Sequence, residues 1–376
     1  MLRSESNLNT PYLSAAQLRR DLGIRDLSDP GEGPHAIQTL VDRAVAALSR
    51  AWDCEVRWCR GERIVPVADN YDRLGYRAEA ISRDARYTRY VDATRMLRSH
   101  ASAMVPPALR RLAAQPASDV LLVCPGIVYR RDAIDWQHTG TPQQLDLWRI
   151  TRRPVSDADL DEMIAVLLGA LAPGLPVRTQ PRTHPYTTNG RQVDVYHAGR
   201  WVEIGECGLA HPGVLASAGL GGHSGLALGA GLDRVLMLAK DVPDIRLLRS
   251  ADPRVARQML DLTAYRRVSA KPAITRDLSV AVPAAEDEDT LGDRIREALG
   301  ADACRVEEVR VLSATPYRRL PPSAIARLGA RPGQQNLLVR VVLRDLDATL
   351  TNKTANTLRD RIYQALHQGT RHEWSA

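Results

Sequence analysis

The amino-acid sequence predicts an α+β protein with two folded parts. The chain has 376 residues, 44% hydrophobic and 25% charged, which is enough to bury more than one core. Short β-rich runs in the first two thirds of the chain are spaced too irregularly for alternating βαβ units, and they favour a mostly antiparallel sheet. Near the C-terminus the pattern changes to β-α-β-β-α, which is compatible with a small ferredoxin-like domain.

The first part starts with two segments of helical apolar spacing, at residues 14–27 and 34–49. The first is interpreted as part of a mobile lead-in covering residues 1–33. The second is interpreted as an amphipathic helix that opens a domain of residues 34–264. Further strands and helices are expected in this domain: strands at 56–58, 120–130, 145–150, 193–196 and 201–204, and helices at 157–171 and 229–238.

A linker is expected at residues 265–272, followed by the second part at 273–376. The acidic residues 286–289 are interpreted as a solvated turn before a helix, whose N-terminus favours acids. The expected order is a strand at 274–282, a helix at 290–299, a strand at 305–313, a proline-rich excursion at 316–332, a strand at 336–343 and a helix at 352–367.

The amino-acid composition indicates where the protein is located and which partners it can bind. No run of about 18 apolar residues is present and the N-terminus is polar, so we expect no membrane partner and a cytoplasmic location. The five cysteines lack paired metal-ligand spacing, which predicts a reduced protein without structural zinc. The net charge is +7 and Arg greatly outnumbers Lys, which permits a nucleic-acid partner. Phenylalanine is absent, and the sequence does not say why.

Two segments carry residues suited to binding a polyphosphate. In the first, a strand ends at Arg130, a loop holds Gln137 and His138, and a returning strand bears Gln144 and Asp146. In the second, the glycine-rich residues 225–231 precede Arg234 in the first turns of a helix. Considered alone, the first segment is equally compatible with a salt-bridged surface hairpin, and the glycines with close strand-helix packing.

Together, in this order and spacing, the two segments resemble motifs 2 and 3 of class II aminoacyl-tRNA synthetases. The chain resembles the single-chain phenylalanyl-tRNA synthetases of mitochondrial type, through the segments 69–72, 96–102, 201–203, 207–208 and 243–246. The C-terminal part is similar to their ferredoxin-fold anticodon-binding domain, through residues 276–279 and 349–351. The resemblance implies a class II antiparallel sheet flanked by helices, followed by that domain.

The resemblance also implies roles for individual residues. Arg130 would meet the α-phosphate of ATP and Arg234 its terminal phosphates, while Gln137 and His138 would close over the nucleotide. Glu203 would help to hold Mg²⁺. The amino-acid substrate would contact Ser102, Gln144 and Asp146 through its ammonium and carboxylate groups. The residues expected around its side chain are Gln180, Arg182, Glu206, Ala227 and Leu228.

This chain departs from the family in that last group. The Phe-Pro-Phe element that grips the phenyl ring in the family reads Gln180-Pro181-Arg182 here, and a small Gly of the family is Glu206. Unpaired polar groups around a phenyl ring would cost several kcal/mol, which predicts a substrate other than phenylalanine. The alternative is that Arg182 and Glu206 pair with each other, or point to solvent, while other walls form the pocket.

Three functions therefore compete. The first is activation of an amino acid and its transfer to tRNA. The second is an adenylate-forming paralogue that passes the acyl group to a carrier protein or small metabolite. The third, a non-catalytic RNA-binding regulator, is disfavoured because Arg130 and Arg234 are both present. The amino acid, the acceptor and the choice between monomer and homodimer stay open.

Overall fold

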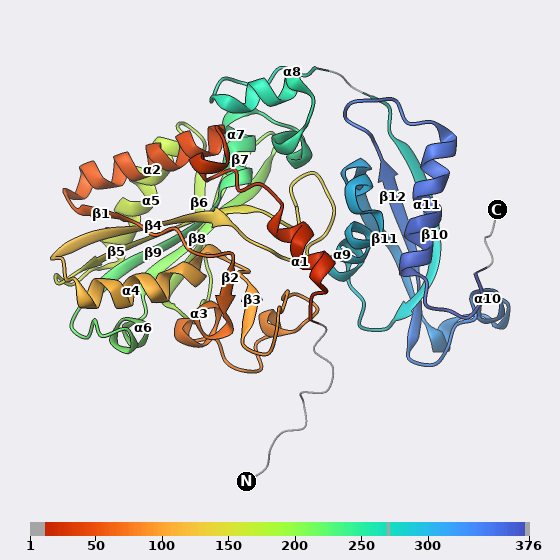
Figure 1. The fold of residues 1–376 in the computed structure, drawn as a ribbon, viewed down its shortest axis with the longest axis horizontal. Helices are drawn as coiled ribbons and strands as arrows, with labels where there is room; N and C mark the ends of the chain where they lie inside the picture. Colours follow the sequence, from red (N-terminus) through yellow and green to blue (C-terminus); the bar gives the residue numbers. More distant parts are fainter. Residues whose placement is uncertain (1–11, 269–270, 373–376) are drawn as a thin grey trace, which may run out of the picture. The chain divides into compact units, whose positions relative to one another are not determined.

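The computed structural model describes residues 12–268 and 271–372, which divide into two compact units (Figure 1). The described part of the first unit comprises residues 12–130, 141–242 and 258–265. The second unit comprises residues 131–140, 243–257 and the described residues from 266 onward. Two short segments of the expected 34–264 domain thus cluster with the C-terminal unit.

A seven-stranded sheet forms the centre of the first unit, in the order β1-β4-β5-β9-β8-β7-β6. All neighbouring strands are antiparallel except β1 and β4, so the predicted mostly antiparallel sheet is confirmed. The strands are β1 (Glu55–Trp58), β4 (Asp119–Ile127), β5 (Gln143–Thr151), β6 (Val177–Pro181), β7 (Thr187–His197), β8 (Arg200–Ala210) and β9 (Ser224–Gly231).

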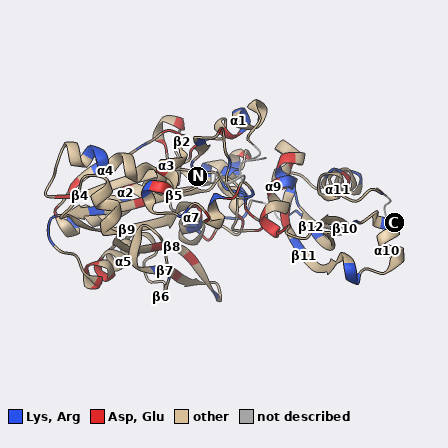
Figure 2. Cartoon of the chain, turned by 90° about the horizontal axis from the view of Figure 1, so that it is seen from below, with Lys and Arg blue, Asp and Glu red and all other residues tan. Residues whose placement is uncertain are grey.

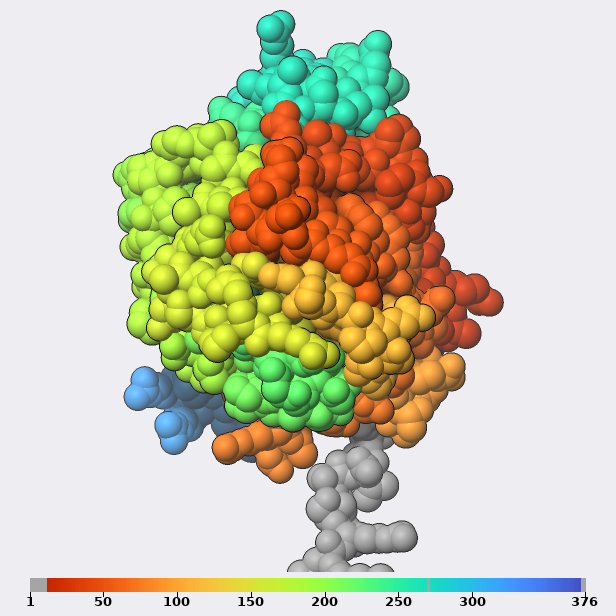
Figure 3. All heavy atoms as spheres, turned by 90° about the vertical axis from the view of Figure 1, so that its left-hand side faces the viewer, coloured from red at the N-terminus to blue at the C-terminus, as the bar shows by residue number. Residues whose placement is uncertain are grey.

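Helices cover both faces of this sheet (Figure 1). On one face, α2 (Ala36–Trp52) packs against α5 (Asp157–Leu171) and α7 (Leu232–Lys240). On the other, α4 (Val105–Ala114) shares a hydrophobic cluster with the sheet residues Leu122 and Trp148. Figure 3 shows the segments of α2 (red-orange), α5 (yellow-green) and the short α6 (Pro212–Ser217, green) packed at one end of the unit.

Of the mobile lead-in expected at residues 1–33, residues 1–11 lie outside the described residues, and the described remainder, including helix α1 (Ala15–Leu22), belongs to the first unit. Two buried carboxylates hold it there. Asp21 forms an ion pair with Arg89 at 2.8 Å, and Asp26 Oδ2 accepts the backbone N–H of Ile127 at 2.9 Å. Because a buried charge is costly without a partner, these contacts specify where the segment lies.

The first unit also contains a two-stranded antiparallel ribbon. It consists of β2 (Ile64–Pro66) and β3 (Arg95–Leu97), with the single-turn helix α3 (Val67–Asn70) between them. The chain then enters a 3₁₀ turn at Ala101–Met104 before α4.

One boundary expected from the sequence is wrong, and some elements of the first unit, among them β6 and α4, were not predicted. The helix expected at 229–238 begins only at Leu232, because Gly229 still pairs with Asp146 and Glu206 as part of β9. Strand β6 was not predicted, since all its residues are exposed and no apolar alternation marks it. Helix α4 was not predicted either; it carries prolines in its first turn, where proline is tolerated.

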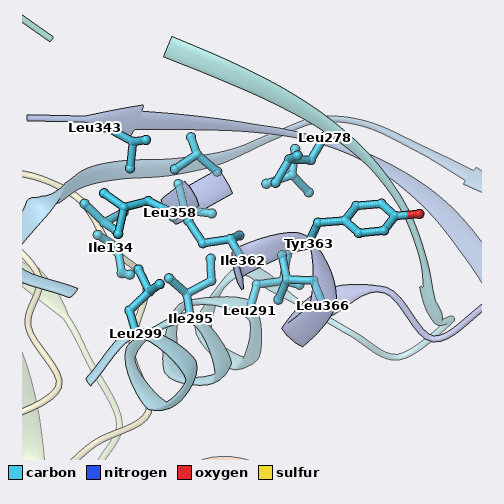
Figure 4. Packing of buried hydrophobic residues seen from close by; sticks show 14 of the residues in the cluster. Ile134, Leu278, Leu291, Ile295, Leu299, Leu343, Leu358, Ile362, Tyr363 and Leu366 are labelled. Atoms are coloured by element: carbon cyan, nitrogen blue, oxygen red, sulfur yellow. The ribbon is translucent and has the colours of Figure 1, made fainter. Parts of the chain in front are cut away.

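The second unit contains a three-stranded antiparallel sheet in the order β10-β12-β11. Its elements follow the predicted β-α-β-β-α order, with the short helix α10 (Pro322–Leu328) added in the proline-rich excursion. They are β10 (Ile274–Pro283), α9 (Glu288–Leu299), β11 (Val306–Pro316), β12 (Gln334–Leu343) and α11 (Asn352–Leu366), and α8 (Pro253–Ala256) precedes them. Side chains from α9 and α11, such as Ile295 and Ile362, pack on the sheet in one core (Figure 4).

The segment 131–140 enters that core through Ile134 (Figure 4). The backbone carbonyl of Ile134 accepts the N–H of Val309 at 2.9 Å. Arg296 of α9 donates hydrogen bonds to the carbonyls of Asp132 and Ala133. The loop between β4 and β5 is therefore built into the second unit by both apolar and polar contacts.

Charges of both signs are interspersed along each unit (Figure 2). Among the residues described, no helix is long and apolar enough to cross a lipid bilayer.

Gly292 provides a test of the packing between α9 and the 131–140 segment. A Cβ atom at this position would lie 2.5 Å from the backbone oxygen of Asp132, so we expect Gly292→Ala to destabilise the protein by about 1–3 kcal/mol through overpacking. Gly169→Ala in α5 is the matched control. No atom lies within 4 Å of the Cβ that this change adds. We therefore expect it to raise the free energy of unfolding by about 0.5–1 kcal/mol, because glycine is unfavourable inside a helix. Urea unfolding measures both; equal stabilisation by the two changes would contradict this packing.

Candidate functional site

The predicted site residues of the first unit gather on one face of three neighbouring strands. Asp146 of β5 and Glu206 of β8 both pair with Gly229 of β9, so the three positions form a row across the sheet. Ala227 shares this face, because it lies two residues along β9 from Gly229. Leu228 does not, since it pairs with Leu147 and Cys207 and therefore points to the opposite face.

Arg130 lies just beyond the end of β4 and is held from two directions. Its Nε donates to the backbone oxygen of Ser99 at 2.8 Å, and its own carbonyl accepts from Arg89 Nη2 at 3.1 Å. Within the described ranges, no carboxylate forms an ion pair with its guanidinium. The positive charge of Arg130 nevertheless affects Asp146, because it favours the ionised carboxylate and so limits the rise in its pKa.

Arg234 occupies the first turn of α7, directly after the glycine-rich strand β9. Its Nη1 donates to the backbone oxygen of Glu203 at 3.2 Å, and it too has no ion-pair partner in the part of the chain described. The neighbouring Asp233 accepts the backbone N–H of Gln143, which ties the start of α7 to the start of β5. The structure thus holds Arg234 through a backbone carbonyl, without an ion-pair partner among the residues described.

Asp146 lies at the buried centre of the site. Burial raises the pKa of its carboxyl to about 6, against hydrogen bonding from Ser102 and the positive charge of Arg130. Gln144 lies two residues earlier on the same strand face, and its Oε1 accepts the backbone N–H of Ala101 at 3.0 Å. Ser102, Gln144 and Asp146 are therefore brought together as predicted.

A β-bulge brings Glu203 to the same face of the sheet as Glu206. Residues three apart on a regular strand face opposite sides, but Val193 pairs with Gly205 while the next residue, Asp194, pairs with Glu203. Burial raises the pKa of Glu203, and the negative charge of Glu206 adds to the rise. The bulge thus supplies two acidic groups at one location.

Arg182 and Glu206 pair with each other, which is the alternative that the sequence left open. Arg182 Nε donates to Glu206 Oε1 at 3.0 Å, and His184 Nε2 lies 2.7 Å from Glu206 Oε2. Burial alone would raise the pKa of Glu206, but the hydrogen bond and charge of His184, together with Arg182, lower it overall. Gln180 pairs with Gln192, which pairs with Glu206, and its side chain donates to Asp194 Oδ2 at 2.7 Å.

Gln137 and His138 lie on the 131–140 segment, which belongs to the second unit. Both donate their backbone N–H groups to Asp135 Oδ1, and the His138 ring contacts Asp135 Oδ2 at 2.6 Å. These two residues therefore belong to a different compact unit from the other predicted site residues, and their closing over the nucleotide stays a prediction.

Sequence reasoning missed an aromatic group beside Asp146. This ring cluster consists of Tyr76, His100, Trp148, His184 and Tyr186, with centroids of neighbouring rings 5.5–6.2 Å apart. Burial, with Arg130 nearby, lowers the pKa of His100 to about 3, so this ring is neutral at pH 7. His100 and Trp148 lie within motif segments, but nothing in the sequence marks Tyr186.

The residues of the site can help to hold a Mg²⁺ ion that binds together with a nucleotide. No group of three His, Cys, Asp or Glu side chains suited to a metal occurs in the described ranges. Mg²⁺ is commonly held by one or two carboxylates together with substrate phosphates, and Glu203 can supply one of them.

Comparisons with known proteins agree with this arrangement. Residues 32–259 match the family of class II tRNA synthetase core domains (F). The chain is 30% identical over 252 residues to the phenylalanine-tRNA ligase alpha subunit of Nostoc punctiforme, covering 65% of this chain and 75% of that protein. It is 32% identical over 259 residues to the alpha subunit of Laribacter hongkongensis, covering 65% of this chain and 76% of that one.

Among solved structures, a pyrrolysyl tRNA synthetase from Desulfitobacterium hafniense matches with a TM-score of 0.44 and 17% identity, over 62% of this chain and 78% of the other. The match to the core domain covers more than half of the chain, and the alignments to the two alpha subunits extend over about three quarters of each. The chain is therefore a divergent member of the phenylalanyl-tRNA synthetase family of class II aminoacyl-tRNA ligases.

Proposed function

We propose that this chain activates an amino acid other than phenylalanine with ATP and transfers it to tRNA. The observation that carries the proposal is the pair of arginines, Arg130 and Arg234, which are held by backbone carbonyls and lack carboxylate partners among the described residues. Positively charged guanidinium groups without a carboxylate partner are suited to bind the negatively charged phosphates of ATP. Gln144 and Asp146 on β5, together with Ser102 from the adjoining 3₁₀ turn, suit the ammonium and carboxylate groups of an amino acid.

In the proposed reaction, the amino-acid carboxylate attacks the α-phosphorus of ATP, and pyrophosphate leaves. Arg130 stabilises the charge that grows on the α-phosphate, and Arg234 holds the leaving phosphates. Mg²⁺, when bound with ATP, would neutralise part of the phosphate charge, and Glu203 would help to hold it. A terminal ribose hydroxyl of tRNA then displaces AMP from the adenylate, so no side-chain nucleophile is required.

The polar residues near the side-chain end of the site support a substrate other than phenylalanine. Glu206, His184 and Arg182 form a bonded group where the family has a Gly and an aromatic residue. Because Arg182 and Glu206 pair with each other, neither is an unpaired charge. The altered shape and polarity of this part of the pocket, and not an unpaired charge, disfavour a phenyl ring. Gln180 and Arg182 are proposed as an outer rim of the pocket.

The second unit is proposed to be the ferredoxin-like anticodon-binding domain. Its antiparallel order β10-β12-β11, with α9 and α11 packed on the sheet, supports this assignment. Many of its arginines are already paired with acids, for example Arg340 with Asp277 and Arg305 with Asp345. This pairing favours, as the second candidate, transfer to a carrier protein or small metabolite.

Removing either arginine should nearly abolish adenylate formation. We expect Arg130→Ala and Arg234→Ala each to slow ATP-pyrophosphate exchange roughly 30-fold to 1000-fold, about 2–4 kcal/mol in activation free energy, because each removes a charge aimed at the reacting phosphates. Arg153→Ala is the control, since this exposed arginine pairs with Asp159. Exchange at the parental rate in either variant would refute the assignment.

The pH dependence of activation should report Asp146. Burial raises the pKa of this carboxyl to about 6, so it is protonated below that pH and loses its attraction for an ammonium group. We expect kcat/KM for the amino acid to fall as pH drops through about 6, with a matching rise in KM, because kcat/KM follows groups of the free enzyme. Asp146→Asn should have a low kcat/KM without this inflection. A flat profile in the parent down to pH 5 would show that Asp146 does not hold the ammonium.

Charge reversal on the second unit separates tRNA from other acceptors. Arg318 and Arg319 are exposed and have no ion-pair partner in the described structure. We expect the double change Arg318→Glu with Arg319→Glu to weaken charging of tRNA without changing ATP-pyrophosphate exchange, since phosphate contacts dominate nucleic-acid affinity. Arg340→Gln, which removes a paired arginine, is the control. Unchanged charging, or an absence of charging by the parent with any tRNA, would favour the carrier or metabolite alternative.

A further inference from the structure

Tyr186 lies at the centre of the ring cluster. It is the last residue before β7, and its ring lies 5.5 Å from His184, 6.1 Å from Trp148 and 6.2 Å from Tyr76. It also packs against the hydrophobic cluster that contains Trp148 and Ala227. The Tyr186 side chain thus contacts both His184 and the sheet residue Trp148.

The Tyr186 side chain spans the part of the sheet next to Asp146. Trp148 follows Asp146 by two residues on β5, so both face the same side, and Trp148 pairs with Ala227 of β9. At its other end, the Tyr186 hydroxyl lies near Ser102 and Asp146, since burial raises the pKa of this tyrosine, the negative charge of Asp146 adds to the rise and Ser102 opposes it. The ring therefore runs from Trp148 to the group proposed to bind the ammonium of the substrate.

Backbone contacts hold Tyr186 in this position. Its carbonyl accepts the N–H of His211 at 2.9 Å, and the preceding Arg182 donates its N–H to the carbonyl of Gly190 at 2.8 Å. His184 is fixed to Glu206 at 2.7 Å. Moving the ring away from Trp148 would require a change in this anchored turn or a different Tyr186 rotamer with loss of the ring contacts to His184 and Trp148.

From this arrangement we propose that Tyr186 occupies the side-chain end of the amino-acid site and restricts the substrate to a small amino acid. The inference rests on the proposed function, because it takes Ser102 and Asp146 as the ammonium site. A substrate side chain extending from that site over Trp148 and Ala227 meets the Tyr186 ring. A small side chain is accommodated, whereas an aromatic one would overlap the ring.

The test measures both catalysis and binding in the full chain. ATP-pyrophosphate exchange is followed with amino acids from glycine to tryptophan. Binding is measured calorimetrically with the stable sulfamoyl-adenosine analogues of alanyl and phenylalanyl adenylate, which need no turnover. The variants are Tyr186→Ala, which removes the ring, Tyr186→Leu, which retains apolar packing if the alanine variant does not fold, and Tyr186→Phe, which keeps the ring. Tyr196→Ala is the control, because this tyrosine is exposed on β7 and contacts Trp201.

We expect the parent to prefer alanine over phenylalanine in both measurements, and Tyr186→Ala or Tyr186→Leu to shift that ratio at least about 100-fold toward phenylalanine. Tyr186→Phe and Tyr196→Ala should keep the parental ratio. A parental preference for a large amino acid other than phenylalanine, or an unchanged ratio in the folded alanine and leucine variants, overturns the inference while leaving the proposed function in place. Tight binding of the phenylalanyl analogue by the parent overturns the inference and, with it, the proposed exclusion of phenylalanine. Absence of exchange and of binding in the parent with every amino acid and analogue overturns the proposed function and this inference together.

Discussion

The antiparallel register of β5, β9 and β8 is the constraint on which the site depends. It places Asp146, Gly229 and Glu206 in one row, and the absent side chain of Gly229 leaves the carboxyl of Asp146 its space. A Cβ at Gly229 would lie 3.1 Å from Asp146 Oδ1. A slip of one residue in β9 would turn its small residues to the opposite face and bring larger ones toward Asp146. The fold thus determines both which groups meet and how closely they approach.

The ion pairs of the first unit distinguish the arginines proposed to bind ATP from arginines that are paired with carboxylates. Arg89 and Arg149 are paired with Asp21 and Asp119, and such bonded pairs position the chain. Arg130 and Arg234 instead donate to backbone carbonyls, which orient the guanidinium groups without neutralising them. Both charges act on carboxyls of the site, Arg130 on Asp146 and Arg234 on Glu203, without forming an ion pair in the part of the chain described. Guanidinium groups without a bonded carboxylate are suited to an anionic ligand, as proposed.

Much of the fold was predictable from the sequence because apolar spacing and turn residues mark strands and helices locally. Helix α5 was predicted at its observed bounds, and Ser102, Gln144 and Asp146 meet as expected. The bulge that turns Glu203 toward Glu206, by contrast, depends on pairing between strands, which single-strand patterns do not contain. The aromatic environment of Asp146 was hidden for the same reason. Tyr186 reaches it from a turn after an exposed strand that has no apolar alternation.

The central claim is that this site forms an adenylate with an amino acid other than phenylalanine. The most direct measurement incubates the purified chain with ATP, Mg²⁺ and an equimolar mixture of proteinogenic and non-proteinogenic amino acids, and identifies the enzyme-bound adenylate by mass spectrometry. The account predicts one or a few aminoacyl adenylates that do not include the phenylalanyl species, together with release of pyrophosphate. Phenylalanyl adenylate as the main bound product, or no adenylate with any amino acid, would contradict it.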